Sequence, residues 1–138
     1  MSFKRLVPLL ALIAIAVPVA ASAGEHCSNA TLNGSYGLHA AGIVIGVGNF
    51  AAVGRFTYDG GGNLSGTLFI RLNGNNVSTN LKGRYSVNPD CTFSDVWMLP
   101  DGSSSTHLSV LVNEGKEYSI LNTTAGEPSV ISGVAKRQ

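Results

Sequence analysis

Asp95 is the residue of this chain with the clearest capacity for chemistry. It lies between Phe93 and Trp97 in an alternating run, and the alternation places all three side chains on one inward face of a strand. A carboxylate inside an apolar interior requires a polar partner. We therefore expect Asp95 to anchor a polar group of a ligand or to act as an acid or base, unless a bulge turns it outward.

The other residues that carry chemistry form no established motif. His26 precedes the first strand, and the alternation points His39 and His107 outward from separate strands, so no spacing typical of a zinc site occurs. No serine occupies a Gly-x-Ser-x-Gly turn of the hydrolase kind. We predict no catalytic residue, no metal site and no cofactor.

The cluster Gly60-Gly61-Gly62 has the composition of a phosphate-binding loop but not its context. Such loops open onto a helix N-terminus, whereas here a strand follows at Leu64. Glycine, Asp and Asn accept the positive φ angles of tight turns, so residues 59–63 are predicted to form a hairpin turn rather than a phosphate or calcium site.

Turns of this kind divide the chain into eight strands. Every connection is short, and no segment after the leader has a helical period, so consecutive strands should pair in antiparallel order. An open sheet would expose two edges, which closure removes. We predict an all-β fold, an eight-stranded antiparallel up-and-down barrel, with strands at 35–45, 50–58, 64–72, 77–87, 92–99, 105–112, 117–123 and 129–136.

The period-2 pattern separates an inward face from an outward face in each strand. The inward residues that we predict to contact a ligand are Phe50, Asp95, Trp97, Asn122 and Ser132. Other residues expected to point inward are Leu64, Leu68, Ile70, Leu72, Val77, Leu81, Leu108, Val110 and Val112. The apolar residues expected outside, as a candidate contact patch, are Phe69, Val96, Met98 and Leu111.

Residues 1–23 have the pattern of a secretory signal peptide. Lys4 and Arg5 precede an apolar run at 6–21, and Ala21-Ser22-Ala23 matches a cleavage site. We predict cleavage after Ala23, a single domain at 24–138 and a secreted or periplasmic location. A retained N-terminal anchor is the alternative, although the apolar run is short for a membrane span.

The chain contains two cysteines, Cys27 and Cys91. In an exported protein an even number of cysteines favours a disulfide, and two free thiols are the alternative. Without the leader, seven basic side chains stand against eight acidic ones, and the charges are scattered along the sequence. No basic patch indicates a nucleic-acid partner.

Alternating strand directions assign each turn to one end of the barrel. The entry segment 24–34 and both cysteines fall at the same end, so a disulfide would strap that segment across it. The bulky inward residues expected at this end are Tyr36, Tyr58, Tyr85, Phe93 and Tyr118. Small inward residues such as Ala40 and Ala52 lie towards the other end, which predicts a cup that is closed at the strapped end and open opposite.

Three segments carry a distinctive order of turn residues: Leu32-Asn33-Gly34-Ser35-Tyr36-Gly37, the hairpin at 56–66, and Gly83-x-Tyr85-x-Val87-x-x-Asp90-Cys91-Thr92. This order resembles that of a group of small, uncharacterised bacterial secreted proteins. At fold level the chain also resembles the calycins, the lipocalin and avidin type of ligand-binding barrel. In calycins a Gly-x-Trp motif on the first strand meets a basic residue of the last strand, so the resemblance implies a contact of Tyr36 with Lys136 or Arg137.

We therefore expect a barrel that binds a small apolar or amphipathic molecule. A surface structural or interaction protein is the first alternative, and an enzyme of the small-barrel isomerase or cyclase kind, with Asp95 as acid or base, is the second. We expect no nucleic-acid partner and no stable membrane insertion, because Arg71, Lys82 and Arg84 on the outward face are unlike an outer-membrane barrel. The sequence predicts no oligomeric state.

Overall fold

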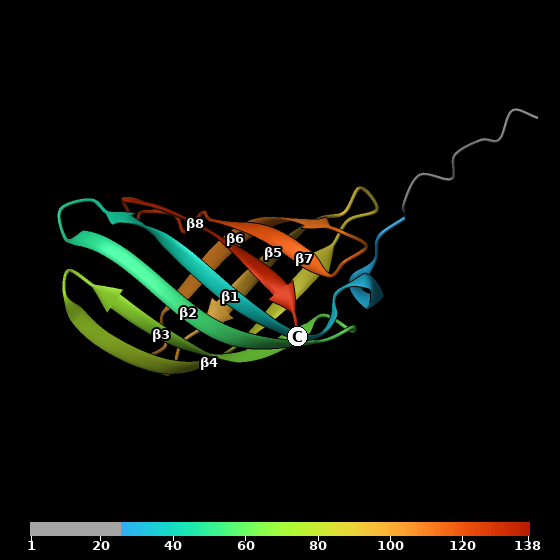
Figure 1. The fold of residues 1–138 in the computed structure, drawn as a ribbon, viewed down its shortest axis with the longest axis horizontal. Coiled ribbons are helices and arrows are strands. Elements are labelled where there is room, and N and C mark those ends of the chain that lie inside the picture. The colour runs from blue at the N-terminus through green and yellow to red at the C-terminus, as the bar shows by residue number, and fades with distance from the viewer. Residues whose placement is uncertain (1–25) are drawn as a thin grey trace, which may run out of the picture.

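Eight antiparallel strands close into a barrel in the computed structural model, which describes residues 26–138 (Figure 1). Each strand pairs with its neighbours in sequence, and pairing of the last strand with the first completes the ring. The predicted fold class is confirmed, and the predicted leader lies outside the described residues. The elements are η1 (Asn29–Thr31), β1 (Asn33–Val44), β2 (Gly48–Asp59), β3 (Asn63–Leu72), β4 (Asn75–Val87), β5 (Thr92–Met98), β6 (Ser104–Val112), β7 (Glu117–Asn122) and β8 (Ser129–Arg137).

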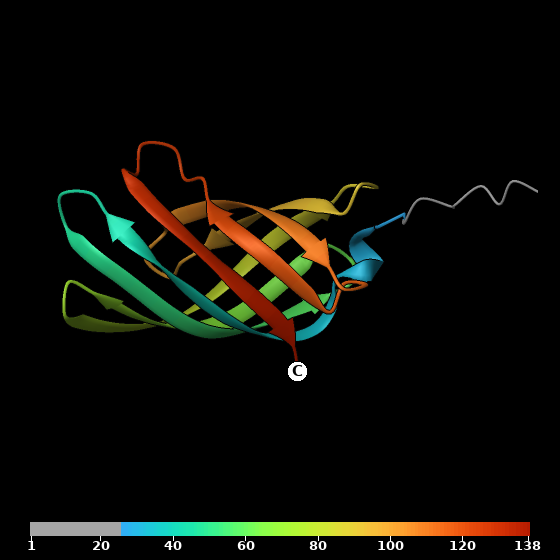
Figure 2. The ribbon, with the colours of Figure 1, turned by 45° about the horizontal axis from the view of Figure 1, so that its top comes forward.

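The barrel wall has an uneven height. The hairpins β1–β2 and β3–β4 extend furthest from the body of the barrel in both ribbon views (Figures 1 and 2). β4 pairs with β5 only over Lys82–Val87, so the earlier part of β4 rises above its neighbour. Val77 lies opposite the inward residue Ile70 and so shares the inward face, as predicted, but it is 52% exposed because β5 does not extend to this height.

Aromatic side chains fill the strapped end of the barrel, where the entry segment and both cysteines lie, as the sequence predicts. Tyr36, Tyr58, Phe93 and Tyr118 are almost completely buried, and the centroids of their contacting rings lie 5.3–5.9 Å apart. The hydroxyl groups of Tyr58 and Tyr118 are hydrogen bonded to each other at 2.8 Å, and that of Tyr36 donates to the carbonyl oxygen of Gly115. The phenol rings can therefore be buried without leaving these hydroxyl groups unpaired.

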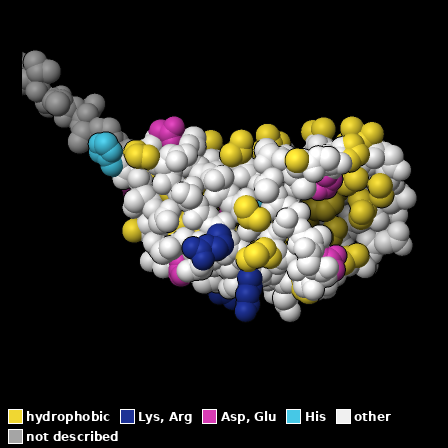
Figure 3. Space-filling model, turned by 180° about the vertical axis from the view of Figure 1, so that it is seen from behind, with side chains coloured by type: hydrophobic (Ala, Val, Ile, Leu, Met, Phe, Trp, Pro, Cys, Tyr) yellow, Lys and Arg dark blue, Asp and Glu magenta, His cyan; other side chains and the backbone are white. Residues whose placement is uncertain are grey.

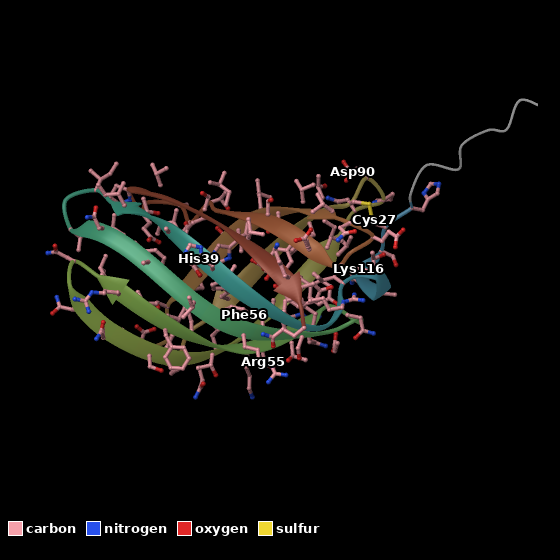
Figure 4. All side chains as sticks on the ribbon, viewed as in Figure 1. Cys27, His39, Arg55, Phe56, Asp90 and Lys116 are labelled. Atoms are coloured by element: carbon pink, nitrogen blue, oxygen red, sulfur yellow. A yellow bond between two sulfur atoms is a disulfide. The ribbon has the colours of Figure 1, made fainter. Side chains whose placement is uncertain are left out.

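The entry segment covers this end of the barrel. As predicted, a disulfide joins Cys27 to Cys91. It lies at the end of the barrel where Cys27 and Asp90 are labelled in Figure 4. The Tyr85 hydroxyl group donates to the Leu32 carbonyl oxygen at 2.8 Å, and Leu32 is fully buried. η1 and the disulfide thus form a lid over the tyrosine cluster.

The last strand is tied to the same end. The guanidinium of Arg137 donates to the Tyr36 hydroxyl oxygen at 2.9 Å and to the Thr31 carbonyl oxygen at 3.3 Å. Lys136 instead forms an exposed ion pair with Glu117 at 3.1 Å. Arg137 is therefore the basic residue that makes the contact implied by the calycin resemblance.

The facing of β6 differs from the prediction. His107, Ser109 and Leu111 point inward and are buried, so the outward positions predicted for His107 and Leu111 are wrong. The residues wrongly predicted to point inward are exposed by 45–56%: Leu108, Val110 and Val112. Directly opposite residues of an antiparallel pair share a face, and the β5–β6 register places inward Asp95 opposite His107.

The facing of β8 was also predicted wrongly. Ser132 is exposed, whereas Ile131 and Ala135 are buried and Gly133 occupies the inward position between them. The β1–β8 register places Gly133 opposite Ala40, where a Cβ atom on Gly133 would lie 2.4 Å from the His39 carbonyl oxygen. This close strand approach requires glycine at the inward position and turns Ser132 outward.

Replacing Cys27 and Cys91 together by Ser should lower the free energy of unfolding. The disulfide closes a loop with a sequence separation of 64, for which the chain-entropy model gives a loss of ~4 kcal/mol. Urea unfolding followed by Trp97 fluorescence measures this loss. A loss below ~1 kcal/mol would contradict the structural role of the strap.

Candidate functional site

A cavity of about 270 Å³ opens at the end of the barrel opposite the disulfide. Figure 3 shows it as a hollow with a hydrophobic lining near the right-hand end of that view. All eight strands contribute to its wall. The lining residues are Leu38, Ala40, Phe50, Ala52, Leu68, Ile70, Leu81, Trp97, Leu99, Ser103, Ser104, Ser105, His107, Ile120, Asn122, Glu127, Ile131 and Ser132.

The cavity exists because small side chains follow large ones along the strands. Phe56 points into the barrel while Arg55 points away from it (Figure 4), and the Phe56 ring stacks on Trp97 with a centroid distance of 4.7 Å. Gly66 lies opposite Phe56, where an added Cβ atom would lie 2.5 Å from the Phe56 ring. Above these rings, Ala40 and Ala52 leave space, so the predicted cup is present.

A buried pair of polar side chains lies beside the Trp97 ring. Asp95 Oδ1 and His107 Nδ1 are 2.7 Å apart, and the side chains are 0% and 5% exposed. The His107 and Trp97 rings lie 4.0 Å apart between centroids. A carboxylate that binds one imidazole nitrogen fixes the ring orientation and leaves the other nitrogen for a substrate or ligand.

Several polar atoms around this pair have no partner among residues 26–138. His107 Nε2 makes no hydrogen bond there, although His107 lines the cavity. Among the described residues, Asp95 Oδ2, Trp97 Nε1 and Ser109 Oγ are buried without a hydrogen bond. Unsatisfied buried polar atoms are uncommon in proteins, so their concentration around His107 distinguishes this part of the cavity wall.

The tyrosine cluster lies close enough to Asp95 to be influenced by its charge. Burial raises the pKa of Tyr58 well above the ordinary tyrosine value, and the neighbouring Tyr118 and Asp95 raise it further. Burial also raises the pKa of Tyr118, again with a contribution from Asp95. Both phenols therefore remain neutral over the pH range in which most proteins are stable.

The structure brings together most, but not all, of the predicted ligand-contacting residues. Phe50, Asp95, Trp97 and Asn122 point inward, and Phe50, Trp97 and Asn122 line the cavity. Ser132 borders the cavity, but its side chain lies on the exposed outer face.

Sequence reasoning missed His107. The signal that would have found it is the turn at 99–103, closed by the Leu99 N–H bond to the Ser103 carbonyl oxygen, because counting outward from its centre at Asp101 places 107 opposite 95. Asp95 then acquires the partner that a buried carboxylate requires.

The acidic turns have local roles. Asp59 Oδ1 accepts hydrogen bonds from the backbone N–H groups of Gly61 at 2.7 Å and Asn63 at 3.0 Å. The hydrogen bond from the Asn63 side chain, together with these backbone bonds, lowers the pKa of Asp59. Within the part of the chain that the structure describes, no group of three or more His, Cys, Asp or Glu side chains could hold a metal ion. The same residues include no helix that is long and apolar enough to cross a membrane.

No protein-family model matches the chain, and no curated protein matches it. Among solved structures, a de novo designed fluorescence-activating β-barrel is similar, with a TM-score of 0.55 and 10% identity over 77% of this chain and 93% of that chain. A redesigned β-barrel gives a TM-score of 0.56 and 14% identity over 80% of this chain and 94% of that one. At these identities the similarity shows the barrel fold alone.

Alkaline pH should destabilise the protein through Tyr58 and Tyr118. Both pKa values are raised above 10.0 in the folded state, so the unfolded chain loses these protons first as the pH rises. Their contribution is complete below pH 10 and is lost above it, by ~1.4 kcal/mol per pH unit for each tyrosine. Urea unfolding between pH 9 and 11 measures this slope.

Replacing Tyr58 by Phe should reduce the dependence of the unfolding free energy on pH by ~1.4 kcal/mol per pH unit, the contribution of one tyrosine. An unchanged slope in the Tyr58→Phe variant would show that the alkaline transition arises elsewhere.

Proposed function

We propose that this protein binds a small apolar or amphipathic molecule in the cavity at the open end of the barrel. The observation that carries the proposal is an open, mainly apolar cup that His107 lines, backed by buried Asp95, with a few further polar residues in the wall, among them Asn122. This combination is typical of small-molecule sites, in which apolar walls supply affinity and a few polar groups determine orientation.

The size of the cavity limits the ligand. Its volume of about 270 Å³ lies just under the ~300–1,000 Å³ usual for pockets that hold drug-sized molecules. A ligand of one or two rings, or a short branched chain, is consistent with this volume. Larger ligands would have to extend out of the open end of the barrel, past Leu99 and Ser103 of the β5–β6 turn.

We propose further that the protein acts after export, in the periplasm or outside the cell. The leader pattern at 1–23 and the Cys27–Cys91 disulfide support this location, since disulfides persist in oxidising compartments. A ligand encountered there would be a small molecule rather than a nucleic acid, because the charged residues form no basic patch.

Native mass spectrometry of the protein purified from its own source tests the proposal. We expect a complex that releases a small-molecule mass when the protein is denatured. A protein that is ligand-free, together with a solved structure whose barrel is filled by its own side chains, would overturn it.

Replacing Ala52 by Leu should block the cavity, because Ala52 lines the cup and is 4% exposed. Trp97, the single tryptophan of the chain, lines the same cavity, so quenching of its fluorescence by 4-nitrotoluene reports occupancy. We expect the substitution to weaken this binding by at least about tenfold, since added methyl groups cannot be accommodated in an occupied cavity.

Ala51→Leu is the matched control. Ala51 precedes Ala52 on β2 but is exposed on the outer face, so this variant should bind 4-nitrotoluene as the parent protein does. Equal effects of both substitutions would show that the probe does not bind in the cup.

A second candidate function, a surface interaction, is favoured by the outer face of β5–β8. Leu108 and Leu121 lie opposite each other on β6 and β7 and are 56% and 47% exposed. Val96 and Val134 extend this apolar surface onto β5 and β8, and Figure 3 shows hydrophobic side chains along the upper edge. Such a surface is common where proteins associate.

The contact patch predicted from the sequence is not a single surface. Lys82 and Arg84 on β4 lie between Phe69 on β3 and Val96 on β5, and Leu111 is buried. Val96 and Met98 are instead continuous with the exposed residues of β6.

If this outer face mediates self-association, sedimentation velocity should show a dimer or larger species at micromolar concentration. Replacing Leu108 and Leu121 together by Lys should convert it to a monomer, because apolar contacts are replaced by charges that repel across the interface. The matched double variant Val53→Lys/Phe69→Lys, at directly opposite exposed positions of β2 and β3, should leave the association unchanged. A protein that sediments as a monomer at all concentrations would exclude this candidate function for self-association.

A further inference from the structure

We propose that the cavity selects flat ligands with an acidic hydroxyl group, and that this hydroxyl donates to Nε2 of His107. The inference rests on the proposed ligand-binding function and specifies its ligand class. It concerns phenol-type and enol-type molecules, as opposed to hydrocarbons of the same shape.

The position of the acceptor nitrogen is determined by backbone pairing. Asp95 and His107 are directly opposite on β5 and β6, and their side chains share the inward face. The contact of 2.7 Å between Asp95 Oδ1 and His107 Nδ1 uses one ring nitrogen. His107 Nε2 has no hydrogen bond among residues 26–138, and a purely apolar ligand would leave it unpaired beside the cavity.

The proton balance of the site favours a ligand that brings a proton. Because Asp95 Oδ1 accepts from the Nδ1–H of His107, Nε2 of the neutral imidazole is an acceptor that carries no proton of its own. A ligand hydroxyl shares its proton with Nε2, and the complex has the same atoms and charge whether that proton lies on oxygen or on nitrogen. The other titratable groups that face the pair are Tyr58 and Tyr118, towards the strapped end, and Glu127 at the rim of the cavity. The described lining of the cavity contains no Lys or Arg.

The surroundings of the pair favour a flat molecule. The His107 ring lies 4.0 Å from that of Trp97, which in turn stacks on Phe56 at 4.7 Å. Aromatic rings in this arrangement offer faces and edges that pack well against another ring. The remaining wall near them is aliphatic, from Leu38, Leu68 and Ile120.

A comparison of 4-nitrophenol with 4-nitrotoluene tests the inference on the unmodified protein. The two molecules have nearly the same shape, and the hydrophobic effect alone would favour binding of the methyl compound over the hydroxyl compound. Titration of Trp97 fluorescence at pH 6 should show that 4-nitrophenol binds about tenfold or more tightly, the effect expected of a hydrogen bond to a charged or strongly polarised partner. Its affinity should fall when the pH exceeds the pKa of the phenol, because the ligand then brings no proton.

The outcomes separate the two proposals. Equal binding, or tighter binding of 4-nitrotoluene, overturns the selection of acidic hydroxyls and leaves the ligand-binding function intact. Failure of both molecules to bind overturns the proposed function of the cavity for ligands of this size, and the further inference with it.

The variant His107→Phe identifies the nitrogen. It retains an aromatic ring beside Trp97 and should still bind 4-nitrotoluene, but the preference should reverse in favour of that molecule. The control variant Asn122→Leu removes another polar cavity residue and should keep the preference for 4-nitrophenol. If His107→Phe retains the preference, Nε2 is not the acceptor; if it does not fold, the comparison and pH profile of the unmodified protein decide.

Discussion

The burial of three tyrosines at one end of the barrel constrains the rest of the structure. Tyr36, Tyr58 and Tyr118 can be packed there because their hydroxyl groups bond to each other, to the Gly115 carbonyl oxygen and to Arg137. Large rings therefore occupy the strapped end, and the alanines at the same inward faces further along β1 and β2 leave the opposite end hollow. The disulfide and η1 cover the filled end, so access to the interior is from the open rim.

Most of the fold could be predicted from the sequence because turns and strands have separate chemical signals. Glycine, Asp and Asn clusters marked the ends of the strands to within a few residues, and strand direction then placed Cys27 and Cys91 at the same end. The facing of β6 could not be predicted from hydrophobicity, since its inward residues His107 and Ser109 are more polar than the outward residues Leu108 and Val110. The register set by the hairpin between β5 and β6 determines which residues of β6 point inward. In β8 the contact of Gly133 with β1 decides the facing, and no periodic pattern reports such a contact.

The candidate site and the apolar outer face have the same origin. When His107 turns inward to meet Asp95, period-2 geometry turns Leu108 and Val110 outward. A barrel whose only requirement was stability would place the leucine inside and the histidine outside. The departure from the hydrophobic pattern in β6 therefore lies at His107, beside the cavity, where a functional requirement would offset the loss of stability.

The central claim is that the barrel has a permanent cup above the Phe56–Trp97 stack, and a crystal structure under xenon pressure tests it most directly. Xenon enters apolar cavities without requiring a polar partner. The account predicts xenon density in the cup between Leu38, Leu68 and Trp97, and none within the tyrosine cluster. A barrel whose cup is closed by its own side chains, with no xenon in it, would contradict the account.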